Sequence, residues 1–423
     1  MLVVKDILEN KEAIIKALSK RKPDAHQLIE EVVQLDAARK KAIFSLEEIQ
    51  AESNKAAKDI GMLFKEGKVQ EANVLKEKVQ AGKSQLQDLK VSSAKIDEAL
   101  KALLYSIPNV PHESVPVGNS EEENEEVKRE GTIPTLHAGA VPHWELLKKY
   151  DLVDFEVGVK ITGAGFPVYK GKGARLQRAM INFFLDEAVN AGYDEVIPPL
   201  LINEASGYGT GQLPDKEGQM YHTQVDDLYL IPTAEVPVTN LYRDEIIPVE
   251  KLPIKNVAYT PCFRREAGSY GKDVRGLNRL HQFDKVEIVQ VVDPKNSYKV
   301  LEDMKNHVES LLVKLGLPYR VLRLCTGDLS FTSALTYDFE VFSTAQDRWL
   351  EVSSVSNFET YQCNRLKLRY REGAEKPQLA HTLNGSALAL PRMLAAILEN
   401  YQTEEGIDIP EVLVPYTGFK SIS

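Results

Sequence analysis

Residues 261–289 read PCFRREAGSYGKDVRGLNRLHQFDKVEIV, two strand-like segments on either side of a long loop that holds three glycines. An ordinary hairpin alternates apolar with polar residues and turns within about two to five residues. Residues two apart in a strand share a face, so this hairpin should carry charge, a ring and a carboxylate on one side. The residues concerned are Arg264 and Glu266 on the first arm and Arg279, His281, Phe283 and Glu287 on the second.

The chemistry of these side chains suits a nucleotide. An arginine is a forked donor for phosphate oxygens, a phenylalanine offers a flat surface for a base, and a glutamate can accept from an exocyclic amine. A surface strand with cross-strand ion pairs gives the same pattern, and from these residues alone both interpretations stay open. The sequence contains no G-x-x-x-x-G-K-[ST] motif, and its scattered glycines form no dinucleotide fingerprint. A nucleotide would therefore bind by neither a P-loop nor a Rossmann crevice.

The size and composition of the chain limit the class of protein to which this hairpin can belong. The chain has 423 residues, 43% of them hydrophobic, which is enough for two or more domains. The net charge of −10 does not attract nucleic acid as a whole, so any such contact needs a local basic patch. The three cysteines show no disulfide or zinc spacing. No signal peptide or long apolar run is found, so we expect a cytoplasmic protein with no membrane partner.

The first third of the chain carries a coiled-coil pattern. Two series of mostly apolar residues keep 4,3 spacing on either side of Gly61 and Gly67, and no proline occurs between residues 24 and 107. A spacing that averages about 3.5 residues predicts supercoiled helices. We expect an antiparallel two-helix hairpin over about 27–104, joined at the two glycines, within a domain of residues 1–105; a dimerisation coiled coil is the alternative. The series are Leu28, Val32, Leu35, Arg39, Ala42, Leu46, Ile49, Ser53, Ala56, Ile60 and Leu63, then Ala72, Leu75, Val79, Gly82, Leu86, Leu89, Ser93, Ile96, Leu100 and Leu103.

Beyond the hairpin the composition changes twice. Residues 106–131 are Pro-rich and then acidic, which predicts a linker. The body, 132–423, is mostly strand-like between 228 and 371, with one long helix at 296–316. Strands in hairpin order without alternating helices argue against a doubly wound parallel sheet. We expect an α+β protein whose body is a mainly antiparallel sheet flanked by helices.

Two further places carry polar residues that a ligand could explain. Glu351 lies close before Ser353 and Ser354, and such oxygen ligands suit Mg²⁺ bridging phosphates. A buried glutamate hydrogen-bonded to serines is the simpler alternative. Arg392 stands where the chain enters an apolar helix, which suits a bound anion, although an arginine can also extend from a helix end to water.

Taken together, the motifs resemble a known family. The hairpin is similar to motif 2 of the class II aminoacyl-tRNA synthetases, GYDEVIPPLLI (192–202) to motif 1, and NGSALALPRMLAAILENYQ (384–402) to motif 3. IPTAEVPVT (231–239), with the long N-terminal hairpin, resembles the seryl-tRNA synthetases in particular. The resemblance covers the whole chain. It implies that residues 132–423 form a class II catalytic domain and that residues 1–105 bind tRNA.

The resemblance also implies roles for individual residues. Arg264 and Arg392 would be the catalytic residues, at the α- and γ-phosphates of ATP. Mg²⁺ would bind Glu351 and Ser354; since residues three apart face opposite sides of a strand, that strand must twist or bulge. The rest of the ATP site would be Arg265, Glu266 at the adenine amine, Leu280, Phe283 stacked on the ring, Val352 and Ser353. The serine site would be Thr233, Ala234 and Glu235 at the ammonium, Glu287 and Ser386 at the hydroxyl with Asn384 nearby, and Arg264.

The implied reaction has two steps. L-Serine and ATP give seryl-adenylate and pyrophosphate, and the seryl group then passes to tRNA(Ser), with selenocysteine tRNA as a further substrate where it is present. Motif 1 implies a homodimer. A relative that loads a carrier protein would lack the N-terminal arm, and a non-catalytic copy would have lost residues of the site. This sequence contains both the arm and the full set of site residues.

Overall fold

The computed structural model describes residues 1–215, 217–266 and 275–423, with the side chains of residues 81, 83 and 84 also left out. The chain divides into two compact units, residues 1–108 and 109–423. Among the helices that the structure describes, none is long and apolar enough to cross a lipid bilayer.

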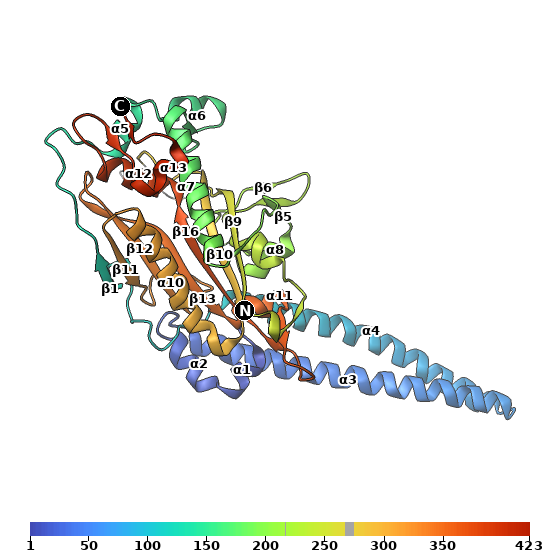
Figure 1. Ribbon diagram of the computed structural model, residues 1–423. Helices are drawn as coiled ribbons and strands as arrows, with labels where there is room; N and C mark the ends of the chain where they lie inside the picture. The colour runs from blue at the N-terminus through green and yellow to red at the C-terminus, as the bar shows by residue number, and fades with distance from the viewer. Residues whose placement is uncertain (216, 267–274) are drawn as a thin grey trace. The chain divides into compact units, whose positions relative to one another are not determined.

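Unit 1 is helical throughout. Two short helices, α1 (Val4–Glu9) and α2 (Lys11–Leu18), precede two long ones, α3 (Ala25–Lys65) and α4 (Val69–Ser106). The long helices run antiparallel and pack against each other along their length (Figure 1). The pairing that the sequence left open is therefore made within one chain.

The seam between α3 and α4 follows the predicted spacing. Every position of the two predicted series is buried or half-buried, and most residues between them are exposed. The prediction of the turn was partly wrong, because α3 continues through Gly61 to Lys65. A helix tolerates an isolated glycine at a cost of about 1 kcal/mol. The reversal needs only residues 66–68, where Gly67 takes a φ of +76°, a conformation that a side chain would disfavour.

Unit 2 is built on one large sheet, antiparallel except at one edge where β4 runs parallel to β9. This confirms the expected α+β class with a mainly antiparallel sheet. In spatial order the strands are β1 (Glu125–Glu130), β11 (Tyr319–Arg323), β12 (Leu335–Ser343), β13 (Arg348–Glu359), β16 (His381–Ala389), β10 (Gln282–Val292), β9 (Ile254–Phe263) and β4 (Asp194–Glu195).

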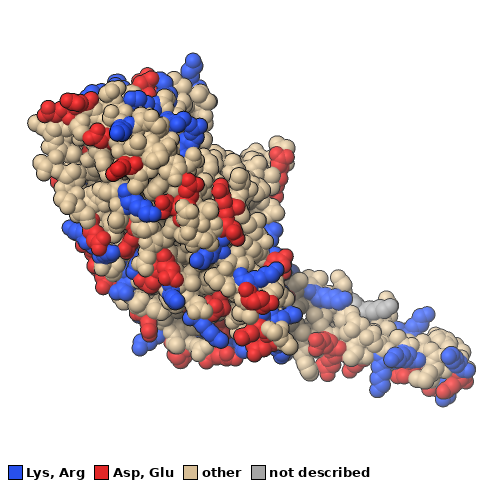
Figure 2. All heavy atoms as spheres, in the orientation of Figure 1, with Lys and Arg blue, Asp and Glu red and all other residues tan. Residues whose placement is uncertain are grey.

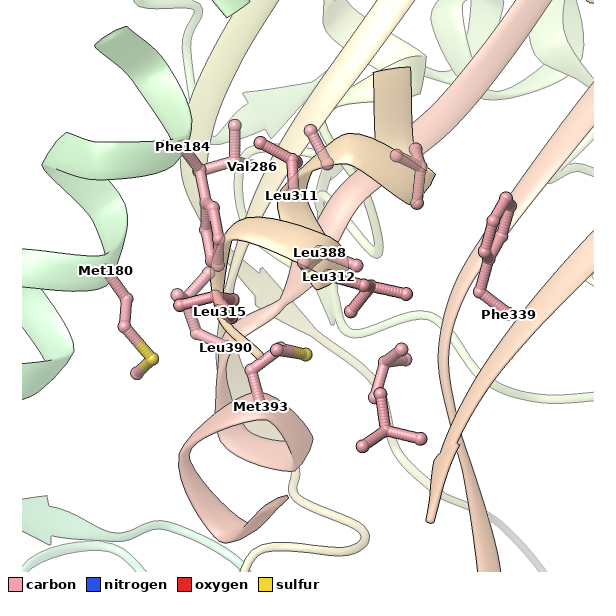
Figure 3. Packing of buried hydrophobic residues seen from close by; sticks show 14 of the residues in the cluster. Met180, Phe184, Val286, Leu311, Leu312, Leu315, Phe339, Leu388, Leu390 and Met393 are labelled. Atoms are coloured by element: carbon pink, nitrogen blue, oxygen red, sulfur yellow. The ribbon is translucent and has the colours of Figure 1, made fainter. Parts of the chain in front are cut away.

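The main core of unit 2 lies between one face of this sheet and three helices. Side chains of α7 (Gly171–Asn190), α10 (Ser297–Lys314) and α12 (Leu390–Asn400) meet there with those of the sheet. Figure 3 shows Phe184 of α7, Val286 of β10 and Leu311 of α10 pointing toward one another. Because strand residues alternate between faces, the opposite face of the same strands is left for polar side chains.

Smaller elements complete unit 2. The helices are α5 (His143–Lys149), α6 (Phe155–Ile161), α8 (Glu204–Thr210), α9 (Glu235–Asn240), α11 (Thr360–Leu366) and α13 (Val414–Thr417). The small sheets are β2 (Val153–Asp154) with β3 (Val168–Tyr169), β5 (Leu201–Ile202) with β7 (Leu228–Leu230) and β6 (His222–Thr223), β8 (Ile246–Pro248) with β14 (Arg369–Arg371) and β15 (Gln378–Leu379), and β17 (Ile407–Asp408) with β18 (Ser421–Ile422).

Much of the stretch predicted as a linker is built into unit 2. β1, from the acidic part of 106–131, pairs antiparallel with β11 at the edge of the large sheet. Its charges fit this position, since Glu125 forms an ion pair with Arg323 directly opposite, and Glu126 forms one with Arg320 farther along β11. Acidic composition alone does not distinguish a charged edge strand from a linker, because charged residues also protect sheet edges.

Candidate active site

The polar face of the sheet is organised by the register of β10 and β16. Glu287 lies directly opposite Ser386, and Asn384 lies opposite Val289. Val286 and Ile288, the neighbours of Glu287 in sequence, belong to the core on the other face. The alternation of the strand therefore turns the carboxylate of Glu287 away from the core and toward α9 and α11.

Asn384 joins two buried carboxylates on this face. Its side-chain amide donates to Glu235 Oε2 at 3.0 Å and to Glu287 Oε1 at 2.8 Å. Ser386 Oγ donates to Glu287 Oε2 at 3.4 Å. Gln362 of α11 donates to Glu235 Oε1 at 2.6 Å, and its own oxygen accepts from Thr382 at 2.7 Å. The predicted residues Glu235, Glu287, Asn384 and Ser386 thus form one hydrogen-bonded group.

Glu235 has an unusual environment for a carboxylic acid. Burial, and secondly the nearby negative charge of Glu287, raise its pKa to about 7. Thr233 and Ala234 precede it at the start of α9, and Thr233 Oγ1 accepts from the Glu235 backbone N–H at 3.2 Å. A buried acid that ionises near neutral pH beside a second carboxylate favours a cationic ligand, because an ammonium would offset both charges.

Lys285 was not predicted as a site residue, yet it lies within this group. Its ammonium forms a 2.7 Å ion pair with Glu287 Oε2, and both side chains are buried. Lys285 is two residues from Phe283 and two from Glu287, so strand alternation places all three side chains on one face. The sequence pattern could therefore have identified Lys285. Gln362 was also missed, and no local pattern points to it, since α11 reaches the site only through the fold.

Arg264 lies just beyond the end of β9, next to residues Thr233–Glu235. Its backbone N–H donates to His281 O at 3.0 Å, and its Nε donates to Pro232 O at 3.3 Å. The guanidinium stands over the ring of Phe283, 5.2 Å from the centroid. The structure therefore brings Arg264, Phe283 and the Thr233–Glu235 segment together, as predicted. A guanidinium held beside an aromatic face can serve an anion and a flat ring at once.

The residues near the loop do not lie on the two strands, contrary to the prediction. β9 ends at Phe263 and β10 begins at Gln282, so neither Arg264 and Glu266 nor Arg279 and His281 belong to a strand. Glu266 has a φ of +47° and pairs with Arg279 at 3.2 Å, and His281 Nδ1 is 2.7 Å from Tyr221 Oη. Side chains alternate between the two faces only where the strands are paired, and the pairing of β9 with β10 ends where the loop begins.

Arg265 and Leu280 are two further residues that were predicted to bind ATP. Arg265 is exposed and donates its backbone N–H to Gln219 O at 2.9 Å. Leu280 is buried in the core cluster. The predicted loop itself, AGSYGKDV (267–274), lies outside the described residues.

Glu351 and Ser354 meet on one face of β13 because the strand bulges between them. Phe339 pairs with Ser353 and Glu340 pairs with Glu351, which leaves Val352 as the extra residue. The bulge that the sequence required is therefore present. Ser354 Oγ donates to Glu351 Oε1 at 3.5 Å. Val352 turns into the core, and the hydroxyl of Ser353 donates to Ser386 O at 2.6 Å.

Arg392 lies beside Glu351. Its NH1 donates to Glu351 O at 2.6 Å and is 3.4 Å from Glu351 Oε2, and its Nε donates to Asn278 O at 3.1 Å. The arginine at the start of α12 is thus held by two backbone carbonyls, with its guanidinium next to a half-exposed carboxylate.

The oxygen atoms near Glu351 suit a hard cation that is shared with a ligand. Asp338 lies opposite Ser354 on β12, and burial, followed by the charge of Glu351, raises its pKa well above the usual range. Two close acids of this kind would be relieved by a divalent ion. Among the described residues, no group of three or more His, Cys, Asp or Glu side chains could hold a metal by itself.

Comparison with known proteins gives one consistent family. A seryl-tRNA synthetase N-terminal domain matches residues 1–111, and a class II tRNA synthetase core domain (G, H, P, S and T) matches residues 220–401. The serine–tRNA ligase of Salinibacter ruber is 49% identical over 100% of this chain and 99% of its own, and that of Carboxydothermus hydrogenoformans is 47% identical over the same shares.

Solved structures agree with this result. The seryl-tRNA synthetase of Pyrococcus horikoshii, complexed with ATP, aligns with a TM-score of 0.92 at 34% identity, over 100% of this chain and 99% of that one. The cytoplasmic enzyme of Naegleria fowleri, in complex with AMP, aligns with a TM-score of 0.87 at 26% identity over the same shares. The chain described here belongs to the seryl-tRNA synthetase family, among the class II aminoacyl-tRNA synthetases.

Proposed function

We propose that this protein attaches L-serine to tRNA(Ser) in two steps. In the first, a carboxylate oxygen of serine attacks the α-phosphorus of ATP, the bond to the bridging oxygen breaks, and pyrophosphate leaves with that electron pair. In the second, a ribose hydroxyl at the tRNA end attacks the seryl carbonyl, and AMP leaves. The observation that carries the proposal is the hydrogen-bonded group of Glu235, Glu287, Asn384 and Ser386, which lies near Arg264.

The serine site is proposed to lie between Thr233–Glu235 and the β10–β16 pair. The substrate ammonium lies at the Glu235 end, and the substrate hydroxyl at Glu287 and Ser386, with Asn384 between them. These groups are buried and polar, so alanine would leave hydrogen-bonding atoms unpaired and would be rejected strongly. Lys285 forms an ion pair with Glu287 in this arrangement, and the carboxylate oxygens of Glu287 can accept from the serine hydroxyl.

The ATP site is proposed to lie between Arg264, Phe283 and Arg392. Arg264 stabilises the charge that develops at the α-phosphate, and Phe283 stacks on the adenine, whose amine donates to Glu266. Arg392 pairs with the γ-phosphate, and Arg265 borders the pocket. The side chains of Leu280, Val352 and Ser353 are buried, so these residues would contribute backbone atoms only. Such a reaction needs positioning and electrostatic stabilisation more than acid–base chemistry. The ATP and AMP complexes of the two related structures support the presence of an ATP site in this protein.

A magnesium ion fits next to Glu351 and Ser354. These two residues would hold it, and when bound it would screen the negative charges of the ATP phosphates. The nearby buried Asp338, whose pKa is raised by burial and by the charge of Glu351, supports a cation at this position.

Unit 1 is proposed as the tRNA-binding domain, residues 1–105, and residues 132–423 as the catalytic domain. The match of residues 1–111 to the family's N-terminal domain supports this division. The visible face of the α3–α4 hairpin carries basic and acidic side chains side by side (Figure 2). We therefore expect the hairpin to recognise RNA by shape and local backbone contacts. Selenocysteine tRNA as a second substrate, and a cytoplasmic location, stay predictions from the sequence.

A homodimer is proposed through the motif 1 segment. Ile197, between β4 and β5, is 88% exposed, and Leu200 and Leu201 nearby are also exposed. Large apolar side chains that gather at the surface typically mark an interface. Size-exclusion chromatography with light scattering on the Ile197→Asp variant tests this: a shift toward the monomer supports the interface, and an unchanged dimer or a monomeric parent protein contradicts it.

The first step can be tested by serine-dependent exchange of pyrophosphate into ATP, screened over all twenty common amino acids. Exchange with serine alone supports the proposed site. Exchange that is equal with threonine or alanine contradicts the serine-specific reading, and no exchange with any amino acid contradicts adenylate formation.

A further inference from the structure

A buried histidine–glutamate pair lies outside the residues assigned above. His143, the first residue of α5, and Glu399, near the end of α12, are both 0% exposed. Glu399 Oε1 accepts from His143 Nδ1 at 2.7 Å, from the His143 backbone N–H at 2.8 Å and from Gln346 Nε2 at 2.9 Å. Ser343 Oγ donates to the other carboxylate oxygen. The carboxylate therefore has four donors and needs no further partner.

The second imidazole nitrogen of His143 serves a different segment. His143 Nε2 is 3.0 Å from the backbone nitrogen of Leu277, whose N–H donates to it. An N–H can donate only to an unprotonated ring nitrogen, so the hydrogen-bond network places the single imidazole proton on Nδ1, where it faces Glu399. The imidazole is thus a neutral connector that donates to α12 on one side and accepts from Leu277 on the other.

This connector supports the residues that hold Arg392. Asn278, the residue after Leu277, accepts from Arg392 Nε through its carbonyl at 3.1 Å. Arg392 and Glu399 are seven residues apart on α12 and therefore lie on the same side of the helix. One side of α12 consequently holds the short segment 276–278 at two neighbouring points, directly through Arg392 and indirectly through His143.

The approach of this segment to the imidazole is close. A Cβ built on Gly276 would lie 2.3 Å from His143 Nε2, and Gly276 has a φ of +62°. Two further contacts hold the segment: Arg275 stands over the ring of Trp144, and Asn278 Nδ2 is 3.4 Å from Gln346 Oε1. The position therefore requires glycine, both for the backbone conformation and for the space.

We propose that His143 is a positioning residue for ATP. By accepting from Leu277 N–H it fixes the carbonyl of Asn278, and that carbonyl orients the guanidinium of Arg392 toward the phosphate end of the nucleotide. This inference rests on the proposed role of Arg392. It predicts a selective weakening of ATP binding when the contact to Leu277 is lost, because the serine group around Glu287 makes none of these contacts.

Two conservative substitutions separate the two functions of the imidazole. The amide of asparagine falls near the Nδ1 position and can keep the bond to Glu399, whereas the amide of glutamine reaches the Nε2 position and can accept from Leu277. For His143→Asn we expect the KM for ATP in serine-dependent exchange to rise about tenfold, which corresponds to about 1.4 kcal/mol, with the KM for serine unchanged. His143→Gln should restore the KM for ATP. His26→Asn, an exposed histidine of unit 1, is the control.

A variant that leaves the His143–Glu399 pair intact provides a second route. Gly276→Ala should displace the segment through its collision with Nε2 and raise the KM for ATP in the same selective way. Hydrogen exchange of peptides covering 275–281 gives a readout without catalysis: Leu277 N–H should exchange faster in His143→Asn and as slowly as wild type in His143→Gln.

The outcomes are distinct. Equal increases in both KM values, or unchanged KM values in His143→Asn and Gly276→Ala, would overturn the positioning role. If His143→Asn does not fold, the result with Gly276→Ala decides the question. A wild-type protein without serine-dependent exchange would instead refute the proposed function, while the hydrogen-exchange comparison would still test the contact.

Discussion

The α3–α4 hairpin and the polar face of the large sheet are built by opposite means. In the hairpin, each seam residue meets a partner set by the same repeat, so one turn resembles the next. On the sheet face, Glu287 meets Ser386 across 99 residues of chain, and Asn384 meets Glu235 across 149. A repeat can lose one member and keep its form, whereas a group of single residues depends on every strand register that assembles it.

The largest effect should come from a single residue of the sheet region. Replacing Arg264 with alanine should lower serine-dependent exchange about 10²–10³-fold, the range found when one preorganised donor is removed from a site of developing charge. The measurement is kcat/KM for exchange. Arg371→Ala, at an exposed position on β14, is the control and should retain wild-type activity. Near-normal exchange in Arg264→Ala would remove its assigned role.

Removing most of the hairpin should separate the two regions. Deleting residues 30–95 and joining Ile29 to Ile96 through a short glycine linker should leave exchange nearly unchanged, because the proposed ATP and serine residues all belong to unit 2. Charging of tRNA(Ser) should fall by more than about tenfold, a loss of over 1.4 kcal/mol. Both reactions are measured on one preparation. If exchange fails together with charging, the hairpin is not a separable module.

The pKa of Glu235 provides a pH test of the proposed contact between this carboxylate and the ammonium of serine. Its pKa is about 7 without substrate, and a bound ammonium would favour the ionised form and lower that pKa. Affinity for serine should therefore be full above pH 7 and weaken as pH falls, by up to about tenfold per unit. The KM for serine between pH 5.5 and 8 measures this. The Glu235→Gln variant should bind serine more weakly, and its KM should lose this pH dependence; a wild-type KM that is flat over the range contradicts the coupling.

The contrast also explains how far the sequence could be interpreted. The hairpin and its seam follow from local spacing, whereas the pairing within one chain was left open beside a dimerisation coiled coil, and the exact turn was misplaced. The bulge in β13 was inferred because Glu351 and Ser354 could not otherwise share a face, and the structure contains it. Lys285 could have been found by alternation, but Gln362 and the pair of His143 with Glu399 could not. Their partners lie 127 and 256 residues away, and only the assembled sheet brings them together.

The smallest effect should be a seam substitution in the hairpin. Leu46 is a half-buried seam residue, whereas Phe44, two positions earlier, is 66% exposed despite its larger apolar side chain. Leu46→Ala should destabilise the hairpin by about 1–2 kcal/mol, less than a fully buried leucine would cost, because part of its surface already meets water. Phe44→Ala should change stability by less than about 0.5 kcal/mol. Hydrogen exchange across residues 25–106 measures both, and serine-dependent exchange should be unchanged in both variants. A larger effect for Phe44 would mean that its exposed ring is covered by a partner, and the hairpin could then no longer be treated as a repeat whose outer face is free.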